Sequence, residues 1–165
     1  MSPRYDLPRA APQPLRAVQQ FVNSIDRHND LDWLDDWFAE HGPVAEPERA
    51  RPLREAFRSL ALANNGLALD PVAVETLNVA AQRLAVRLGE DGSVRLDGGG
   101  DPLDCLVAIA FGAMLDGSWS RLKACRNCRW SFYDGSPNRS ATWCSMQLCG
   151  NRSKTRTYRT RRRAV

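Results

Sequence analysis

The sequence lacks a long apolar run. A membrane-spanning helix needs about 18 to 20 consecutive apolar residues, and no apolar run in the 165-residue sequence approaches that length. The first residues, MSPRYDLPRAAPQPLR, contain no apolar core of the kind found in secretory signal peptides. We therefore expect a cytoplasmic protein that has no membrane partner.

Histidines are scarce and catalytic motifs are missing. The two histidines, His28 and His41, lie far before the cysteine cluster that begins at Cys125. A zinc deaminase needs an H-x-E motif, and the chain has His28-Asn29-Asp30 instead. The G-x-S-x-G, P-loop and dinucleotide-binding motifs are not found either. The sequence predicts a protein that is not an enzyme.

Acidic residues are almost missing from the C-terminal quarter. Residues 1–120 contain 11 Lys and Arg against 18 Asp and Glu, a net charge of −7. Residues 121–165 contain 12 Lys and Arg against Asp134 alone, a net charge of +11. So large a local excess of positive charge indicates a polyanion or an acidic protein surface as its partner.

The apolar spacing before residue 120 is mainly helical. Residues 1–14 are rich in proline and are expected to form an irregular arm. Residues 15–120 are expected to form a helical domain with one β-hairpin, in which Val86 and Leu88 alternate on one strand and Val94 and Leu96 on the other. The helices are expected from Leu15 to Ile25, from Leu31 to Phe38, from Pro47 to Gly66, from Asp70 to Ala81 and from Asp101 to Leu115. The fold class is therefore α+β and mainly α.

Four of the five cysteines lie in residues 121–165, in two groups. Cys125 and Cys128 form a C-x-x-C pair, and Cys144 and Cys149 follow after 15 intervening residues. Pairs with this spacing are typical of a closed, tetrahedral Zn²⁺ site, which leaves no open position for catalysis. Free thiols or two disulfides are the alternatives. We expect one structural zinc in a treble-clef-like finger, with a hairpin that pairs residues 130–133 with residues 141–143, and with Cys149 in the first turns of a basic helix.

The segment that contains the last ligand resembles a known family. Cys125-x-x-Cys128, the run Trp143 to Met146 and the run Cys149-Gly150-Asn151-Arg152 resemble the CGNR zinc finger of bacterial proteins. Members of that family commonly carry an upstream helical domain, which is known as the Putative stress-induced transcription regulator domain. Phe21-Val22-Asn23-Ser24 is similar to its opening pattern. The resemblance implies a transcription regulator that has a C-terminal DNA-binding finger.

The basic residues after Gly150 have the spacing of a helix face. Arg152, Arg156, Arg159 and Arg163 recur at intervals of three and four residues. Such a helix fits the major groove of DNA, where arginine reads guanine and other basic groups hold phosphates. RNA and an acidic protein surface remain alternatives, and Trp130, Phe132 and Tyr133 are candidates for stacking on RNA bases. The predicted nucleic-acid contacts are Asn151, Arg152, Lys154, Arg156, Arg159, Arg162 and Arg163.

A third hypothesis makes the helical domain a sensor of an unidentified small molecule. Its candidate pocket residues are Asn23, Trp33 and Trp37, although aromatic residues with this spacing more often belong to a core.

Overall fold

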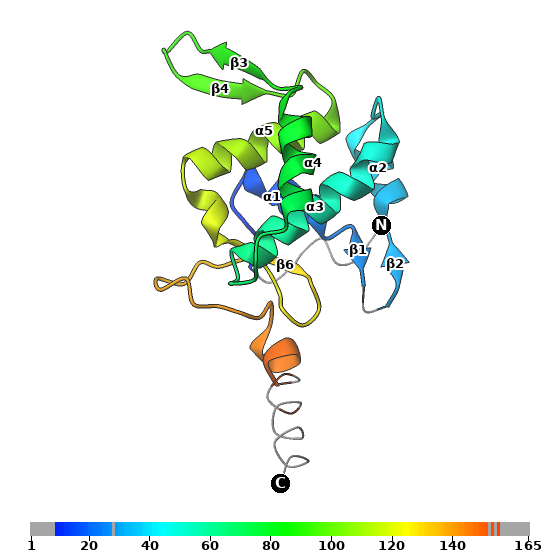
Figure 1. Cartoon of the computed structure of the whole chain (residues 1–165), viewed down its shortest axis with the longest axis vertical. Helices are drawn as coiled ribbons and strands as arrows, with labels where there is room; N and C mark the ends of the chain where they lie inside the picture. The colour runs from blue at the N-terminus through cyan, green and yellow to red at the C-terminus, as the bar shows by residue number, and fades with distance from the viewer. Residues whose placement is uncertain (1–8, 28, 152, 154, 156–165) are drawn as a thin grey trace.

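A computed structural model of the chain describes residues 9–27, 29–151, 153 and 155. In these residues the protein is mainly α with short β-hairpins, as the sequence predicts (Figure 1). The described α-helices are α1 (Leu15–Val22), α2 (Leu34–His41), α3 (Ala50–Ala63), α4 (Pro71–Ala81) and α5 (Pro102–Leu115). Short 3-10 helices, η1 (Pro47–Arg49) and η2 (Ser118–Arg121), precede α3 and follow α5.

The core lies among α1, α3 and α5, with α2 and α4 packed against them. Phe21 of α1 is fully buried, and its ring lies 4.9 Å from that of Trp37 and 6.4 Å from that of Phe57. Phe57 in turn packs against Trp119 of η2, at 6.1 Å between ring centroids. The aromatic contacts therefore extend from α2 through the core to the start of the cysteine module.

Two helix starts are fixed by local sequence. The side chain of Asp70 accepts a hydrogen bond from the backbone of Val72, and Asp101 accepts from Leu103 and Asp104. Each aspartate is followed by a proline in the first helical turn, so both predicted N-caps are confirmed. The buried residues of α4 are Ala73, Leu77 and Ala80.

The described residues form three separate antiparallel hairpins. The predicted one is confirmed, and pairs β3 (Ala85–Leu88) with β4 (Val94–Asp97). A second, β1 (Ile25–Asp26) with β2 (Leu31–Asp32), lies where the sequence predicted helix. Helix α1 ends at Val22, and a hydrogen bond from the backbone of Trp33 to Ser24 closes this hairpin.

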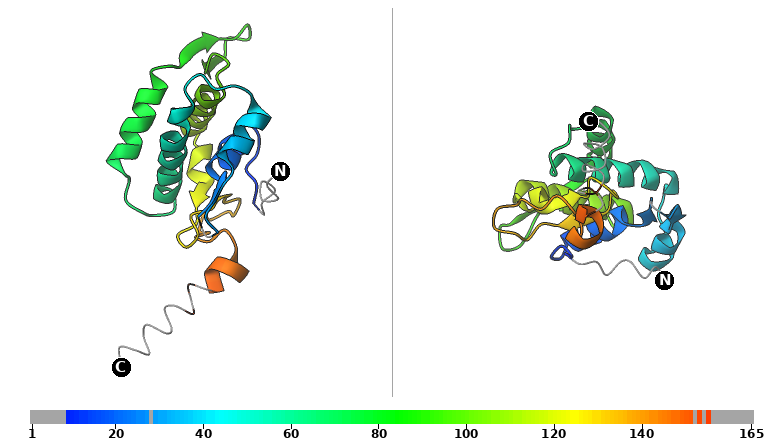
Figure 2. Two further views of the ribbon diagram at one scale, coloured as in Figure 1. Left: turned by 90° about the vertical axis from the view of Figure 1, so that its right-hand side faces the viewer. Right: turned by 90° about the horizontal axis from the view of Figure 1, so that it is seen from below.

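The third hairpin joins the helical domain to the cysteine module. Strand β5 (Leu122–Ala124) pairs with β6 (Ser131–Tyr133), and β5 packs on α3. The module lies at one end of the helical domain, and the β3–β4 hairpin projects from the opposite end (Figures 1 and 2). Among the described residues, none of the helices combines the length and the hydrophobicity needed to span a bilayer.

Candidate metal centre

The first cysteine pair lies in the turn between β5 and β6. The backbone of Cys125 donates to Trp130, at 2.8 Å, and the backbone of Arg129 donates to Cys125, at 2.9 Å. Arg129 has a φ of 66°, in the left-handed region, which tightens the turn. The two thiols of Cys125 and Cys128 are thereby presented from one knuckle.

The second pair arrives on a helical turn. Ser145 caps this turn, because its hydroxyl accepts from the backbone of Leu148 at 3.3 Å. The turn is the π-helix η3 (Met146–Gly150), and it contains Cys149, as the sequence predicted for the last ligand. A Cβ on Gly150 would lie 2.9 Å from the Met146 sulfur and 3.4 Å from the Trp143 ring. A glycine at this position lets Met146 and Trp143 pack over the turn.

The four sulfur atoms form one cluster, within 4.8 Å of one another. The Sγ atoms of Cys128 and Cys144 are 3.5 Å apart, and those of Cys144 and Cys149 are 3.7 Å apart. Sulfurs that surround Zn²⁺ tetrahedrally at about 2.3 Å are separated by about 3.8 Å. All four thiols are free of disulfides. The cluster therefore fits a zinc ion, and the disulfide alternative does not describe it.

The thiols are too close to ionise together without a cation. A hydrogen bond from Cys128, with a second from Cys144, holds the pKa of Cys125 well below its usual range. The same contacts with Cys125 raise the pKa of Cys128 and of Cys144. A divalent metal would supply the positive charge that allows all four to bind as thiolates. Asn127 donates to the Cys149 sulfur at 3.5 Å, a contact that the spacing of the cysteines does not predict.

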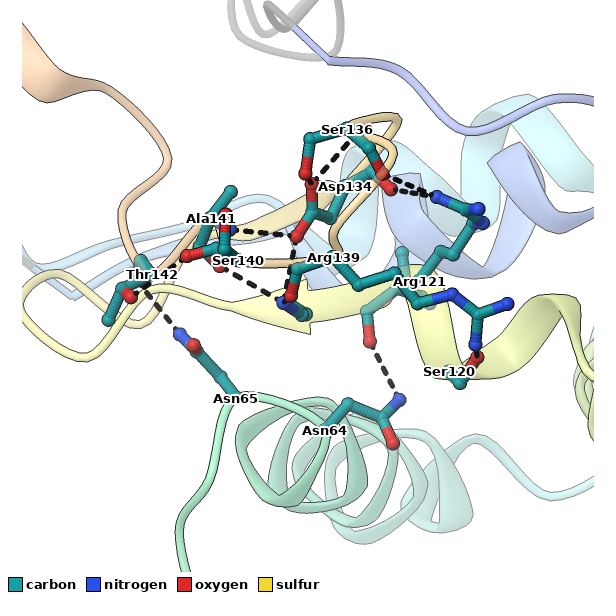
Figure 3. A network of polar contacts seen from close by, with 12 residues as sticks. Asn64, Asn65, Ser120, Arg121, Asp134, Ser136, Arg139, Ser140, Ala141 and Thr142 are labelled. Carbon is teal, nitrogen blue, oxygen red and sulfur yellow. Dashed lines mark hydrogen bonds and ion pairs between the residues drawn. The ribbon is translucent and has the colours of Figure 1, made fainter.

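A buried ion pair fixes the loop between the two cysteine pairs (Figure 3). Nζ of Lys123 lies 2.8 Å from Oδ2 of Asp134, and both side chains are almost completely buried. Asp134 also accepts from the backbone of Ala141, at 2.9 Å, and from the hydroxyl of Ser136, at 2.6 Å. Burial would raise the pKa of Asp134, but the hydrogen bonds from Lys123 and Ser136 outweigh it and hold that pKa well below its usual range.

The predicted pairing of residues 130–133 with residues 141–143 is wrong, and the contacts of this ion pair give the reason. Residues 141–143 form no strand, although residues 131–133 do. Lys123 donates to the carbonyl oxygens of Arg139 and Ala141, so the returning segment is bonded to a side chain rather than to a neighbouring strand. The free edge of β6 is bonded instead by the side chain of Asn23 and by the backbone carbonyl of Arg9, which accepts from Tyr133 at 2.9 Å.

Polar side chains of the helical domain form hydrogen bonds with the backbone of the module. Asn23 donates to the carbonyl of Ser131 at 2.9 Å and accepts from its N–H at 2.7 Å. Asn65, at the end of α3, donates to the carbonyls of Ala124 and Thr142, at 2.8 Å each (Figure 3). Further side-chain hydrogen bonds to backbone carbonyls run from Asn64 to Trp119 and Leu122, from Gln19 to Ser131, and from Arg58 to Arg129. These hydrogen bonds dock the module on the helical domain.

One of the predicted nucleic-acid contacts, Asn151, lies among the described residues. Asn151 is exposed and helical, one residue beyond η3. The other predicted contacts lie outside the described residues, namely Arg152, Lys154, Arg156, Arg159, Arg162 and Arg163. The predicted contact of these residues with nucleic acid stays a prediction.

The three predicted pocket residues lie in different settings. The amide of Asn23 is bonded to Ser131, Trp37 is only 1% exposed within the core, and Trp33 precedes α2. A groove of about 870 Å³ runs instead between α3 and α4, and none of these three residues lines it. A small-molecule role for them stays a prediction.

A helical domain fastened to a four-cysteine centre is the architecture of a zinc-finger protein. Two protein families match the chain. Residues 15–117 match ABATE, described as Putative stress-induced transcription regulator, and residues 121–162 match the CGNR zinc finger. The chain belongs to the ABATE family and carries a CGNR zinc finger, the arrangement that the sequence resemblance implied. A search of the curated proteins found no match.

Proposed function

We propose that this protein is a cytoplasmic, bacterial DNA-binding transcription regulator, and not an enzyme. One structural Zn²⁺ per chain would be held by Cys125, Cys128, Cys144 and Cys149. The observation that carries the proposal is the position of the last ligand. Cys149 lies in a helical turn, and the chain runs from that turn directly into its most basic segment. The metal would thereby fix where the basic segment leaves the folded protein.

Four of the five basic side chains within the described module are already engaged by the protein. Arg121 donates to the carbonyls of Asp134 and Ser136, and Arg126 donates to the carbonyl of Asn65. Lys123 is paired with Asp134, and Arg139 donates to the hydroxyl of Ser120. The contacts with nucleic acid are therefore assigned to the seven Lys and Arg residues after Gly150, a segment without a single acid.

Two of the three residues predicted to stack on RNA bases are buried and the third, Tyr133, is half-buried, which favours DNA over single-stranded RNA. Phe132 is completely buried and Trp130 is 8% exposed, so neither ring is open for a base to stack on it. Arginine and asparagine on a helix suit the edges of base pairs in the major groove. RNA and an acidic protein surface are the alternative partners of the same segment.

The test is selection of bound sequences by the purified, zinc-loaded full-length chain. Random duplex DNA and random RNA would be offered together at two salt concentrations, with an acidic protein as competitor. We expect enrichment of one duplex DNA motif that persists at the higher salt. Enrichment of RNA, or binding that acidic protein abolishes and that shows no sequence preference, would contradict the proposal.

A further inference from the structure

The β3–β4 hairpin exposes an apolar face that the described residues leave uncovered. Val86, Leu88 and Val94 are 71%, 75% and 69% exposed, and Leu96 is half-buried beside them. The hairpin projects from the helical domain, away from the cysteine module (Figures 1 and 2). A two-stranded hairpin is barely stable in water alone, and a continuous apolar face on it indicates a partner surface.

The opposite face of the hairpin is polar and suits solvent. Arg87 lies opposite Arg95, and its guanidinium is 3.2 Å from the carboxylate of Asp97. The apolar face, in contrast, has no charged or hydrogen-bonding side chain among its four residues. A phosphate backbone or a charged peptide would find no partner there, so the occupant must itself present an apolar face.

The register makes this face complementary to itself. Val86 pairs with Leu96, and Leu88 pairs with Val94, so the two leucines occupy one diagonal of the patch and the two valines the other. A two-fold axis in the plane of the patch, either along or across the strands, places each leucine over a valine of the second copy. Large side chains then face small ones at all four positions, which is the arrangement that favours close packing.

We propose that two copies of this chain associate by stacking the apolar faces of their β3–β4 hairpins. The interface would be two-fold symmetric, with Val86, Leu88, Val94 and Leu96 of each copy at its centre. Four side chains from each copy bury less than the roughly 1,200 Å² that stable complexes need, so dissociation is expected at micromolar concentrations. Because the cysteine module lies at the other end of the described molecule, the pairing leaves both modules uncovered.

The test is sedimentation equilibrium of the zinc-loaded full-length protein, from about 1 to about 300 μM. The wild type should fit a monomer–dimer equilibrium. The double variant Leu88→Thr/Val94→Thr keeps β-forming residues in the strands and should weaken dimerisation at least about tenfold. Val72→Thr on α4 is the matched control, because Val72 is 72% exposed outside the hairpin, and it should dimerise like the wild type.

A wild type that stays monomeric at the highest concentration would overturn the proposal, and so would a double variant that dimerises as tightly as the wild type. Circular dichroism and zinc content establish that each variant is folded. If the double variant fails to fold, Val86→Thr gives the answer, because it removes one apolar contact per copy from the same face. It should weaken dimerisation less than the double change, and no weakening would overturn the proposal.

Discussion

Asn23 and Ser131 are 108 positions apart, yet the side-chain amide of Asn23 bonds both backbone polar groups of Ser131. It donates to the Ser131 carbonyl at 2.9 Å and accepts from the Ser131 N–H at 2.7 Å. These are the two bonds that a neighbouring strand would make. The asparagine therefore protects the outer edge of β6, an edge that would otherwise invite pairing with another chain.

Replacing Asn23 by alanine should destabilise the whole described fold. The change leaves the N–H and one of the acceptor interactions of buried Ser131 without their partner, at a cost of about 2–4 kcal/mol in the free energy of unfolding. Asn23→Asp should not restore this stability at neutral pH, because its buried carboxylate accepts from the N–H but has no proton to donate to the Ser131 carbonyl. Urea unfolding measures the difference. Asn138→Ala, at an exposed position, is the control and should have little effect.

Zinc content should follow the four clustered cysteines. We expect one zinc per chain by elemental analysis, and its loss or marked weakening in Cys149→Ser, because a tetrahedral site loses a ligand. Cys105→Ser is the control, since Cys105 lies on α5 outside the cluster, and it should keep the metal. A wild type without zinc, or a Cys149→Ser variant that retains it fully, would refute the assignment.

The buried pair of Lys123 and Asp134 should make stability depend on pH in one direction. The pKa of Asp134 is lower in the folded protein than in the unfolded chain, where it is about 4. Its ionised form therefore stabilises the fold above about pH 4, and this contribution is lost as the pH falls further. The free energy by which Asp134→Asn is less stable than the wild type should stay constant between pH 8 and about pH 5.

The zinc site also loses its metal in acid, so the comparison must be made at each pH between wild type and variant. A deficit that shrinks between pH 8 and about pH 5 would show that another group titrates there. Lys123→Met is a second test of the same ion pair, because it leaves the Asp134 carboxylate buried without its cation. It should cost at least as much stability as Asp134→Asn.

Binding of random duplex DNA should weaken steeply with salt. If Arg152, Arg156, Arg159 and Arg163 share a helix face, four phosphate contacts give a slope of about −3.6 in a plot of log affinity against log salt. Arg156→Ala or Arg159→Ala should each reduce the slope by about one, and Arg161→Ala, predicted to lie off that face, should reduce it less. Equal losses for all three would indicate that the segment binds as a polycation without a helical face.

Local sequence was sufficient for the features that depend on neighbouring residues. Asp70 and Asp101 cap their helices through bonds to residues two or three positions on, and both were predicted. The four cysteines were identified for the same reason, because the spacing of each pair carries the chemistry of a metal ligand. The β3–β4 hairpin followed from alternation around a turn.

Features that depend on distant residues were not predicted. The sequence suggested that residues 130–133 pair with residues 141–143, but β6 pairs with β5, because Lys123 and Asp134 bind the returning segment. Asn23 was considered for a ligand pocket, and nothing near it in the sequence points to Ser131. Asn65 was predicted only as part of a helix end. Its hydrogen bonds join it to Ala124 and Thr142, which lie 59 and 77 positions further along the chain.

The long separation between Asn23 and Ser131 also sets an order of events during synthesis. At about 5–20 residues per second, a ribosome needs roughly 5–20 s to make the residues between them. During that interval the nascent helices have Gln19, Asn23 and Arg58 facing water. The four clustered cysteines emerge after nearly all of the helical domain, so metal binding is among the last steps. A shortage of zinc would leave a folded helical domain joined to an unfolded cysteine module.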